Sequence, residues 1–325
     1  MFADEKVLVT GGAGLIGAAL VRRLAAEGAQ VRAVVHRRRP PEEEPGVDYL
    51  HADLTRAEDC AIAVAGVRYV IHCAASTSGA FTTAATPMVH VTPNVIMNSL
   101  LLEAAHAARV DKFLWLSSTV GYPDASHPVR EEEFLTGEPF DKYYFAGWAK
   151  RFGEVLCRMY SDKLRERLTT IVLRPTNVYG PGDKFDPARS HVTAALIRKV
   201  VERQSPIEVW GTGNDVRDLI YLDDFVEACL LALERLDSFT PLNIGSGRPC
   251  TVRQILQTIL ACEDWQDAEV VYAHDKPTMI PVRLVDTRRA EELLGFRART
   301  GLREGIQQTI DWYRQTRRAE EVACR

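Results

Sequence analysis

The chain has 325 residues, of which 46% are hydrophobic and 26% are charged, enough to bury the core of one large α/β unit or of two closely packed subdomains. Its formal net charge of −4 argues against nucleic acid or an anionic membrane as the main partner. Seven dispersed cysteines without a CxxC pair favour reduced thiols in the cytoplasm over a metal site, and no apolar run approaches the roughly 18 residues of a membrane span.

Strands and helices alternate along the first 175 residues. The expected strands, each a short apolar run, span residues 6–10, 31–35, 47–50, 68–75, 113–118 and 169–175. Helical patterns occupy residues 15–28, 87–109 and 148–164. Because a strand that follows a crossover helix joins its predecessor in parallel, this alternation predicts a doubly wound α/β fold with helices on both faces of a parallel sheet.

The character of the sequence changes after Pro175. Loops rich in Gly, Pro and Asn follow, such as "RPTNVYGPGDKFDP" and "WGTGNDVRD", and the expected strands become shorter. We therefore divide the chain into a cofactor-binding domain, residues 1–175, and a smaller subdomain that binds the substrate, mostly residues 176–325.

A glycine-rich loop, "TGGAGLIG", follows the first strand and opens the first helix. Gly11 permits the tight turn, Gly14 lets the backbone approach a pyrophosphate, and Gly17 lets helix and strand pack closely. The phosphate would lie at the helix N-terminus, beside Leu15 and Ile16. In this context the loop predicts dinucleotide binding rather than a glycine turn that only packs.

The end of the second strand bears on the choice between NADP and NAD. Its residues are His36, Arg37, Arg38 and Arg39, with no carboxylate to accept a hydrogen bond from a ribose 2′-hydroxyl. Guanidinium groups suit a 2′-phosphate, so we expect NADP, with NAD still possible; the alternative is a solvated basic loop.

The third strand ends in "HADL". Asp53 there could meet the adenine of the cofactor, with Leu54 beside it. An aspartate at a strand end is also a common helix cap, and the sequence leaves both readings open.

Five segments together carry a family resemblance: "TGGAGLIG", "HCAAS", "FLWLSS", "RPTNVYGP" and "VRDLIYLDD". They resemble the extended short-chain dehydrogenase/reductases that act on nucleotide sugars, and among these most closely the GDP-fucose synthases. The likeness runs from about residue 6 to about residue 295 and implies an NAD(P)-dependent enzyme.

The resemblance implies roles for residues of the first domain. Ser118 matches the serine that hydrogen-bonds the sugar C4 oxygen, and Lys150 matches the lysine that holds the nicotinamide ribose. Asn94 matches a helix asparagine near the active site, and Ala74 and Ala75 match residues along the cofactor. The alternatives are a serine that caps the next turn and a lysine that is simply solvated.

The resemblance also implies roles in the second half of the chain. Asn177 and Arg217 match groups near the nucleotide diphosphate, and Val209 and Lys276 match further substrate contacts. His191 matches a histidine that transfers protons. A salt bridge in "DVRD" is the alternative for Arg217, and a plain helix N-terminal residue is the alternative for His191.

Two positions depart from the family pattern. The family's catalytic tyrosine stands four residues before the lysine, where this chain has Ala146. The epimerising cysteine of the GDP-fucose synthases aligns with Val120. Neither alanine nor valine can transfer a proton, so the epimerising part of the reaction is in doubt.

Tyrosines close to Lys150 are candidates for the missing acid. Tyr143 shares the lysine's helical face and Tyr144 does not. If Gly147 loosens the segment and the helix begins near it, Tyr143 could swing in and serve as a displaced catalytic acid. Tyr122, after the serine strand, is another phenol nearby, with packing as the stronger alternative.

We therefore expect an NAD(P)-dependent epimerase, reductase or dehydratase that acts at C4 and neighbouring carbons of a nucleotide sugar, with a GDP-linked hexose as the favoured substrate. The resemblance further implies a homodimer formed through helices 87–109 and 148–164. The alternative is a catalytically silent relative that binds NADP(H) as a sensor or assembly protein.

Overall fold

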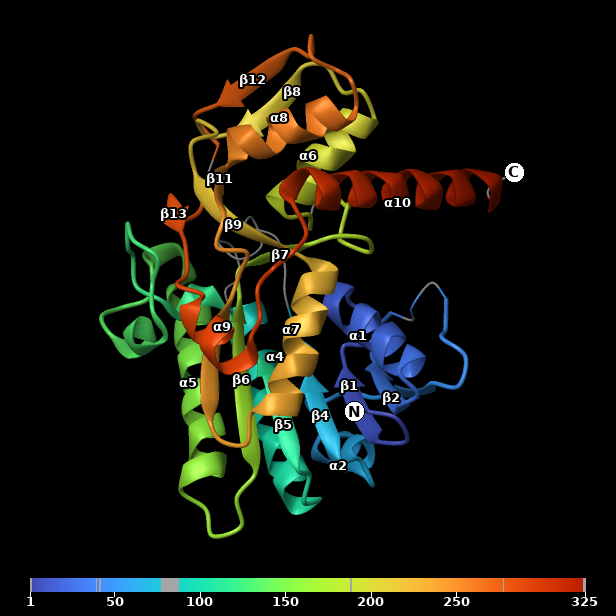
Figure 1. The fold of residues 1–325 in the computed structure, drawn as a ribbon, viewed down its shortest axis with the longest axis vertical. Coiled ribbons are helices and arrows are strands. Elements are labelled where there is room, and N and C mark those ends of the chain that lie inside the picture. Colours follow the sequence, from blue (N-terminus) through green and yellow to red (C-terminus); the bar gives the residue numbers. More distant parts are fainter. Residues whose placement is uncertain are drawn as a thin grey trace.

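A seven-stranded parallel sheet forms the centre of the protein in its computed structural model, which describes residues 2–38, 40, 42–76, 88–187, 189–276 and 278–323 (Figure 1). The strand order is β10-β6-β5-β4-β1-β2-β3, and every neighbouring pair is parallel. The strands are β1 (Lys6–Thr10), β2 (Gln30–Val35), β3 (Asp48–His51), β4 (Tyr69–His72), β5 (Lys112–Leu116), β6 (Thr169–Pro175) and β10 (Thr240–Ile244).

Helices cover both faces of this sheet, which confirms the doubly wound α/β prediction. One face carries α1 (Leu15–Ala26), α7 (Leu222–Arg235) and α9 (Arg288–Leu294); the other carries α2 (Ala57–Val64), α4 (Met88–Ala107) and α5 (Tyr144–Asp162). Successive residues of β5 point to opposite faces: Leu114 and Leu116 pack in the α1 and α7 layer, Phe113 and Trp115 in the α4 and α5 layer.

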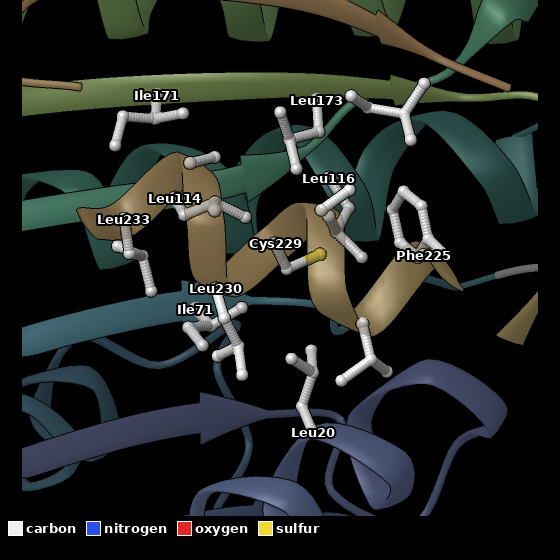
Figure 2. Packing of buried hydrophobic residues seen from close by; sticks show 14 of the residues in the cluster. Leu20, Ile71, Leu114, Leu116, Ile171, Leu173, Phe225, Cys229, Leu230 and Leu233 are labelled. Carbon is white, nitrogen blue, oxygen red and sulfur yellow. The ribbon is translucent and has the colours of Figure 1, made fainter. Parts of the chain in front are cut away.

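Helix α7 lies centrally on its face of the sheet. Figure 2 shows Phe225, Cys229 and Leu230 of α7 among leucines and isoleucines of the strands, with Leu20 of α1 beside them. These side chains are almost completely buried, and burial of one such leucine or phenylalanine stabilises the fold by roughly 1.5–3 kcal/mol.

The second half of the chain also contributes to the large sheet. Strand β10 pairs with β6 along its whole length, from Thr240 opposite Ile171 to Ile244 opposite Pro175. Residues 222–244, which form α7 and β10, thus pack with the large sheet although they follow the expected boundary at residue 175. The division into 1–175 and 176–325 stays a prediction, and residues 222–244 are its exception because they belong to the large sheet and its helices.

Smaller sheets and three helices make up the rest of the second half, which Figure 1 shows over one end of the large sheet. Strand β9 (Val216–Tyr221) pairs with β7 (Asn177–Tyr179), β11 (Pro249–Thr251) and β13 (Val282–Arg283), and β8 (Ile207–Trp210) pairs with β12 (Val270–Ala273). The helices are α6 (Val192–Val201), α8 (Val252–Cys262) and α10 (Leu302–Ala323). They enclose a separate apolar cluster with β8 and β9.

Three expected boundaries were wrong. The strand expected at 68–75 ends at His72, and the strand expected at 113–118 ends at Leu116. Ala74, Ala75 and Ser118 therefore lie in the loops that follow these strands. The helix expected at 148–164 begins at Tyr144. The helix expected at 87–109 is seen as Met88–Ala107, and Pro87 lies outside the described residues. Within the described part of the chain, no helix is long and apolar enough to cross a membrane.

Candidate active site

The glycine-rich loop connects β1 to α1 at the carboxyl edge of the sheet. Gly11 has φ of +69°, and a Cβ atom there would lie 3.0 Å from the backbone of Ala74. A Cβ atom at Gly17 would lie 2.2 Å from the Gly11 carbonyl oxygen. Gly14 is the N-cap of α1 and brings no side chain to its first turn. The loop therefore presents backbone N–H groups at Leu15 and Ile16 to an anion, as a pyrophosphate requires.

A buried histidine holds the neighbouring strand end against this loop. The Thr10 hydroxyl accepts hydrogen bonds from the N–H groups of Cys73 and Ala74, at 3.1 and 3.0 Å. Its own proton therefore goes to His72 Nδ1, 2.7 Å away, and His72 Nε2 donates to Asn98 Oδ1 at 2.9 Å. These bonds replace sheet pairing after His72, which is why the strand stops there.

Burial of His72 makes stability depend on pH. Desolvation lowers its pKa to about 4 from an ordinary 6.5, so the unfolded chain binds the proton first as pH falls. The free energy of unfolding should therefore fall by about 2 kcal/mol between pH 7 and pH 5 through this group. Urea denaturation at both pH values should show this fall in the wild type and lose it in His72→Gln. His127 is exposed, so His127→Gln is the control and should keep the wild-type fall. An unchanged pH dependence in His72→Gln would contradict the prediction.

The basic segment after β2 is exposed at His36, Arg37 and Arg38, and Arg39 lies outside the described residues. His36 Nε2 lies 3.9 Å from Asp53 Oδ2, across the ends of β2 and β3. Cations are thus gathered where the ribose of a dinucleotide would lie on this fold.

Asp53 stabilises a turn. Its Oδ1 accepts from the hydroxyl and the N–H of Thr55, at 2.7 and 3.0 Å, and these bonds lower its pKa. Leu54 is buried in the core, where its carbonyl accepts a bond from Cys60 Sγ. The adenine contacts expected of Asp53 and Leu54 stay predictions.

Asn94 of α4 holds the loop that follows β4. Its Oδ1 accepts from the Ser76 N–H at 2.8 Å and its Nδ2 donates to the Ser76 carbonyl at 3.0 Å. The loop residues Ala74 and Ala75 are thereby fixed beside Gly11. Asn94 thus supports the backbone along which a cofactor would lie, and its expected proximity to the active site stays a prediction.

Ser118 lies two residues beyond the end of β5. Its Oγ accepts a 3.3 Å bond from the Val120 N–H and caps the short turn that follows, so the capping alternative applies. A capping hydroxyl still has its own proton to donate. Val120, where the relatives' pattern has a cysteine, is half-buried in that turn.

Lys150 of α5 reaches the same strand end. Its Nζ donates to the Leu116 carbonyl at 2.9 Å and lies 4.7 Å from the centre of the Trp115 ring. Burial lowers the pKa of its ammonium to about 8, although the nearby Glu154 carboxylate raises it. The ammonium is therefore anchored two residues from Ser118, and it is not the solvated surface lysine of the alternative.

The position four residues before Lys150 lies inside a regular helix. Because α5 begins at Tyr144, Ala146 stands in its first turn, on the face that carries Lys150. Gly147 does not loosen this helix, and that expectation was wrong. A Cβ atom at Gly147 would lie 2.6 Å from Pro139 Cβ and 2.8 Å from the Val120 carbonyl oxygen, so glycine is required for close packing.

Tyr143 immediately precedes α5 and faces the charges of the second half. Burial raises the pKa of its phenol, while Arg217 and Arg283 oppose the rise. The adjacent Lys142 donates to the Thr278 carbonyl, which ties this segment to the second half. Tyr144 is exposed and packs on Phe145. The loop expected over residues 143–146 is helical from Tyr144 on. Tyr143 lies where α5 meets the second half of the chain, and its role as acid stays a prediction.

The two expected diphosphate ligands stand on neighbouring parallel strands. Asn177 of β7 pairs with Leu219 of β9, and alternate residues of β9 point to one side, so Arg217 shares a face with them. Arg217 donates to Asp215 Oδ2 at 3.2 Å and to the Pro281 carbonyl at 3.2 Å. The salt bridge foreseen as an alternative is therefore present, and it also holds the guanidinium in place.

Sequence reasoning missed Arg283. It is almost fully buried in β13, next to Arg217 in the sheet register, and donates to the Pro123 and Tyr122 carbonyls. Burial lowers its pKa. The signal was present in "PVRLVD", where an arginine interrupts an apolar strand.

His191 is the exposed N-cap residue of α6. Burial raises the pKa of the Asp183 carboxyl, while a bond from the Lys184 N–H and the nearby His191 oppose the rise, so Asp183 and His191 are neighbours. The loop that carries Asp183 approaches the glycine-rich loop, since a Cβ atom at Gly182 would lie 3.9 Å from Leu15 Cδ1. His191 is thereby placed on the side of the second half that faces the cofactor loop.

The remaining expected contacts differ in exposure. Val209 is buried in the core of the second half, opposite Tyr272, so only its backbone could meet a substrate. Lys276 is exposed in the turn after β12. Neither contact is tested by the geometry. Among the described residues, no group of His, Cys, Asp and Glu side chains could hold a metal ion.

A parallel sheet with a glycine-rich loop, a serine and an anchored lysine at its carboxyl edge defines a dinucleotide-binding protein of the Rossmann class. Comparison with known families is more specific: the NAD dependent epimerase/dehydratase family matches residues 7–245. The chain belongs to this family. Its relatives within the family are NAD(P)-dependent enzymes that act on nucleotide sugars.

Individual relatives support the same assignment. The chain is 30% identical over 318 residues to the probable GDP-L-fucose synthase 1 of Oryza sativa subsp. japonica, covering 95% of this chain and 92% of that one. It is 30% identical to the GDP-L-fucose synthase of Escherichia coli strain K12, over 96% and 97% of the two chains. Among solved structures, the UDP-glucose 4-epimerase of Thermotoga maritima with UDP-glucose superposes with a TM-score of 0.86 at 28% identity, over 96% and 99%.

Proposed function

We propose that this enzyme carries out redox chemistry at C4 of a GDP-linked hexose, as a reductase or epimerase, and that it prefers NADP(H). The observation that carries the proposal is the bond of Lys150 to the Leu116 carbonyl, which puts an ammonium two residues from Ser118 at the edge that holds the glycine-rich loop. The relatives named as GDP-L-fucose synthases support the GDP-linked substrate.

The residues present fit a dinucleotide, because the glycine-rich loop leads directly into the N-terminus of α1, where backbone N–H groups can bind a pyrophosphate. A Cβ atom at Gly11 or Gly17 would collide with neighbouring backbone and displace this cradle. A bound nicotinamide supplies hydride transfer at C4. Ser118 would donate to the C4 oxygen, and Lys150 would hold the nicotinamide ribose. Arg217 and Asn177 would bind the diphosphate, Arg37 and Arg38 the 2′-phosphate of NADP, and Tyr143 or His191 would supply the proton.

One observation favours a second candidate function. Ala146 stands in the place of the family's tyrosine, inside a regular helix and not in a displaced loop. A catalytically silent protein that binds NADP(H) would keep the cradle without this acid. The cysteines of the described residues are free thiols, most of them buried, which suits the cytoplasm for either candidate.

Three measurements test the proposal. Calorimetry should show tighter binding of NADP than of NAD, and equal affinities would remove the argument from Arg37 and Arg38. A thermal-shift panel of GDP-, UDP- and dTDP-hexoses with NADP present should single out GDP. Enzyme-bound NADP(H) should then change its absorbance on addition of the active sugar. A sugar that binds without such a change would favour the silent protein.

The diphosphate assignment can be tested with one variant. Arg217→Ala should weaken nucleotide-sugar binding by about 2 kcal/mol, the usual size of a charge-assisted hydrogen bond, and leave NADP binding unchanged. Arg248→Ala is a matched control, since Arg248 also donates to backbone carbonyls of the second half. Equal weakening of both ligands would show that Arg217 is structural.

We also propose a homodimer formed through α4 and α5. Large apolar side chains are exposed along these helices: Met88, Val89, Ile96, Phe145, Trp148, Phe152, Val155 and Met159. Covering such a face is the usual function of a two-fold contact. Light scattering at micromolar concentration should give a dimer mass, which Phe152→Glu reduces to that of a monomer. Ile62→Glu, equally exposed on α2, should stay dimeric, and a monomeric wild type would refute the proposal.

A further inference from the structure

A buried ion pair lies one helical turn beyond Lys150. Glu154 of α5 is 4% exposed and Arg174 of β6 is 3% exposed. Arg174 Nε donates to Glu154 Oε1 at 2.9 Å and its Nη2 to Oε2 at 2.5 Å. The Ser117 hydroxyl adds a 2.6 Å bond to Oε1. Both carboxylate oxygens are thus hydrogen-bonded, as a buried ion pair requires.

The guanidinium of this pair is held from its far side. Arg174 Nη1 donates to the Tyr122 hydroxyl at 2.7 Å and to the Glu131 carbonyl at 3.0 Å. The Tyr122 hydroxyl in turn donates to Asn243 Oδ1 of β10 at 2.7 Å. The network therefore ties α5 to strands β6 and β10 and fixes the position of the guanidinium.

The surroundings of Lys150 make its charge depend on Glu154. Its ammonium lies over the Trp115 ring, and burial lowers its pKa, while the Glu154 carboxylate raises it. His72 of β4 is a second neighbour, neutral because burial lowers its pKa. Cys157 of α5 is buried and its raised pKa keeps it a neutral thiol. Lys150 Nζ bonds to the Leu116 carbonyl, and Glu154 Oε1 accepts from the hydroxyl of the next residue, Ser117. The ammonium and the carboxylate therefore lie at the same strand end, where their attraction favours the charged lysine.

We infer that Glu154 is a positioning residue that keeps Lys150 charged beside the nicotinamide site, and that Arg174 and Ser117 hold it for this task. The inference rests on the proposed function, in which Lys150 works as an ammonium. Glu154 itself touches neither substrate nor cofactor. A neutral amine at this point would lose one of its donors and its attraction for an oxyanion.

The ionisation of Lys150 can be measured without ligand or activity. The chain has eight lysines, so protein labelled with carbon-13 at lysine Cε gives few signals, and the one lost in Lys150→Arg is assigned to Lys150. Its pH titration in the wild type should be compared with Glu154→Gln. The variant should titrate at least about one pH unit lower, since it removes a nearby opposite charge and leaves that of Arg174.

A double variant without net charge change separates the electrostatic effect of Glu154 from its effect on folding. Glu154→Met with Arg174→Met removes both charges at similar volume and keeps the inference testable if Glu154→Gln does not fold. Lys150 should then titrate below the wild type but above Glu154→Gln. A Lys150 titration that stays at the wild-type pH in a folded variant would overturn the inference. Calorimetry of NADP on the wild type reports separately on the proposed function, so the two can fail independently.

Discussion

Replacing Tyr143 by phenylalanine should lower turnover of the nucleotide sugar by roughly 10²–10⁴, the usual contribution of a general acid. Phenylalanine keeps the ring, including its contact with Phe140, and removes only the hydroxyl. NADP affinity should stay unchanged, because Tyr143 lies among Arg217 and Arg283 on the substrate side. Steady-state rates with a single sugar and NADP titrations by calorimetry provide both readings.

Tyr144→Phe is the matched control, since Tyr144 is exposed and packs only at the surface with Phe145. It should retain nearly full turnover. If Tyr143→Phe does so as well, the displaced-acid hypothesis is wrong and the proton comes from His191 or from water. If the wild type turns over no nucleotide sugar, the silent protein is the better description.

A second large effect is expected at the glycine-rich loop. Gly17→Ala would put a methyl group 2.2 Å from the Gly11 carbonyl oxygen, so the loop must shift. Strain of this kind is roughly 1–3 kcal/mol. If the displaced loop carries it, NADP should bind about 5- to 150-fold more weakly. Gly301→Ala, where a Cβ atom meets nothing within 4 Å, should bind NADP as the wild type does. Unaltered NADP affinity in Gly17→Ala would place the pyrophosphate elsewhere.

The alternation of strands and helices was sufficient to predict the large sheet, because β-branched and apolar runs define its buried strands. Strand β10 was missed for a physical reason. It contains Pro241, which has no N–H to donate and is tolerated here because β10 is an edge strand. The start of α5 was placed too late because Gly147 was taken as a helix breaker, whereas tertiary packing against Pro139 requires it.

The site was predictable only where its signal is local. Glycine spacing indicated the phosphate loop, and the serine and lysine could be placed once the family pattern was seen. The pair of Glu154 and Arg174 and the cluster of Tyr143, Arg217 and Arg283 join residues far apart in the chain. The sequence can indicate single candidates among them, but only the fold brings them together, so it could not predict these groupings.

The position of α7 and β10 also has a consequence for how the chain is made. A ribosome delivers the six strands up to Pro175 well before residues 222–244, which cover one face of the sheet and complete its edge. Until that segment emerges, Leu114, Ile171 and Leu173 have no helix over them and the β6 edge is open to foreign strands. The nascent chain therefore passes through a stage at risk of aggregation. A fragment cut at residue 175 would remain at that stage permanently.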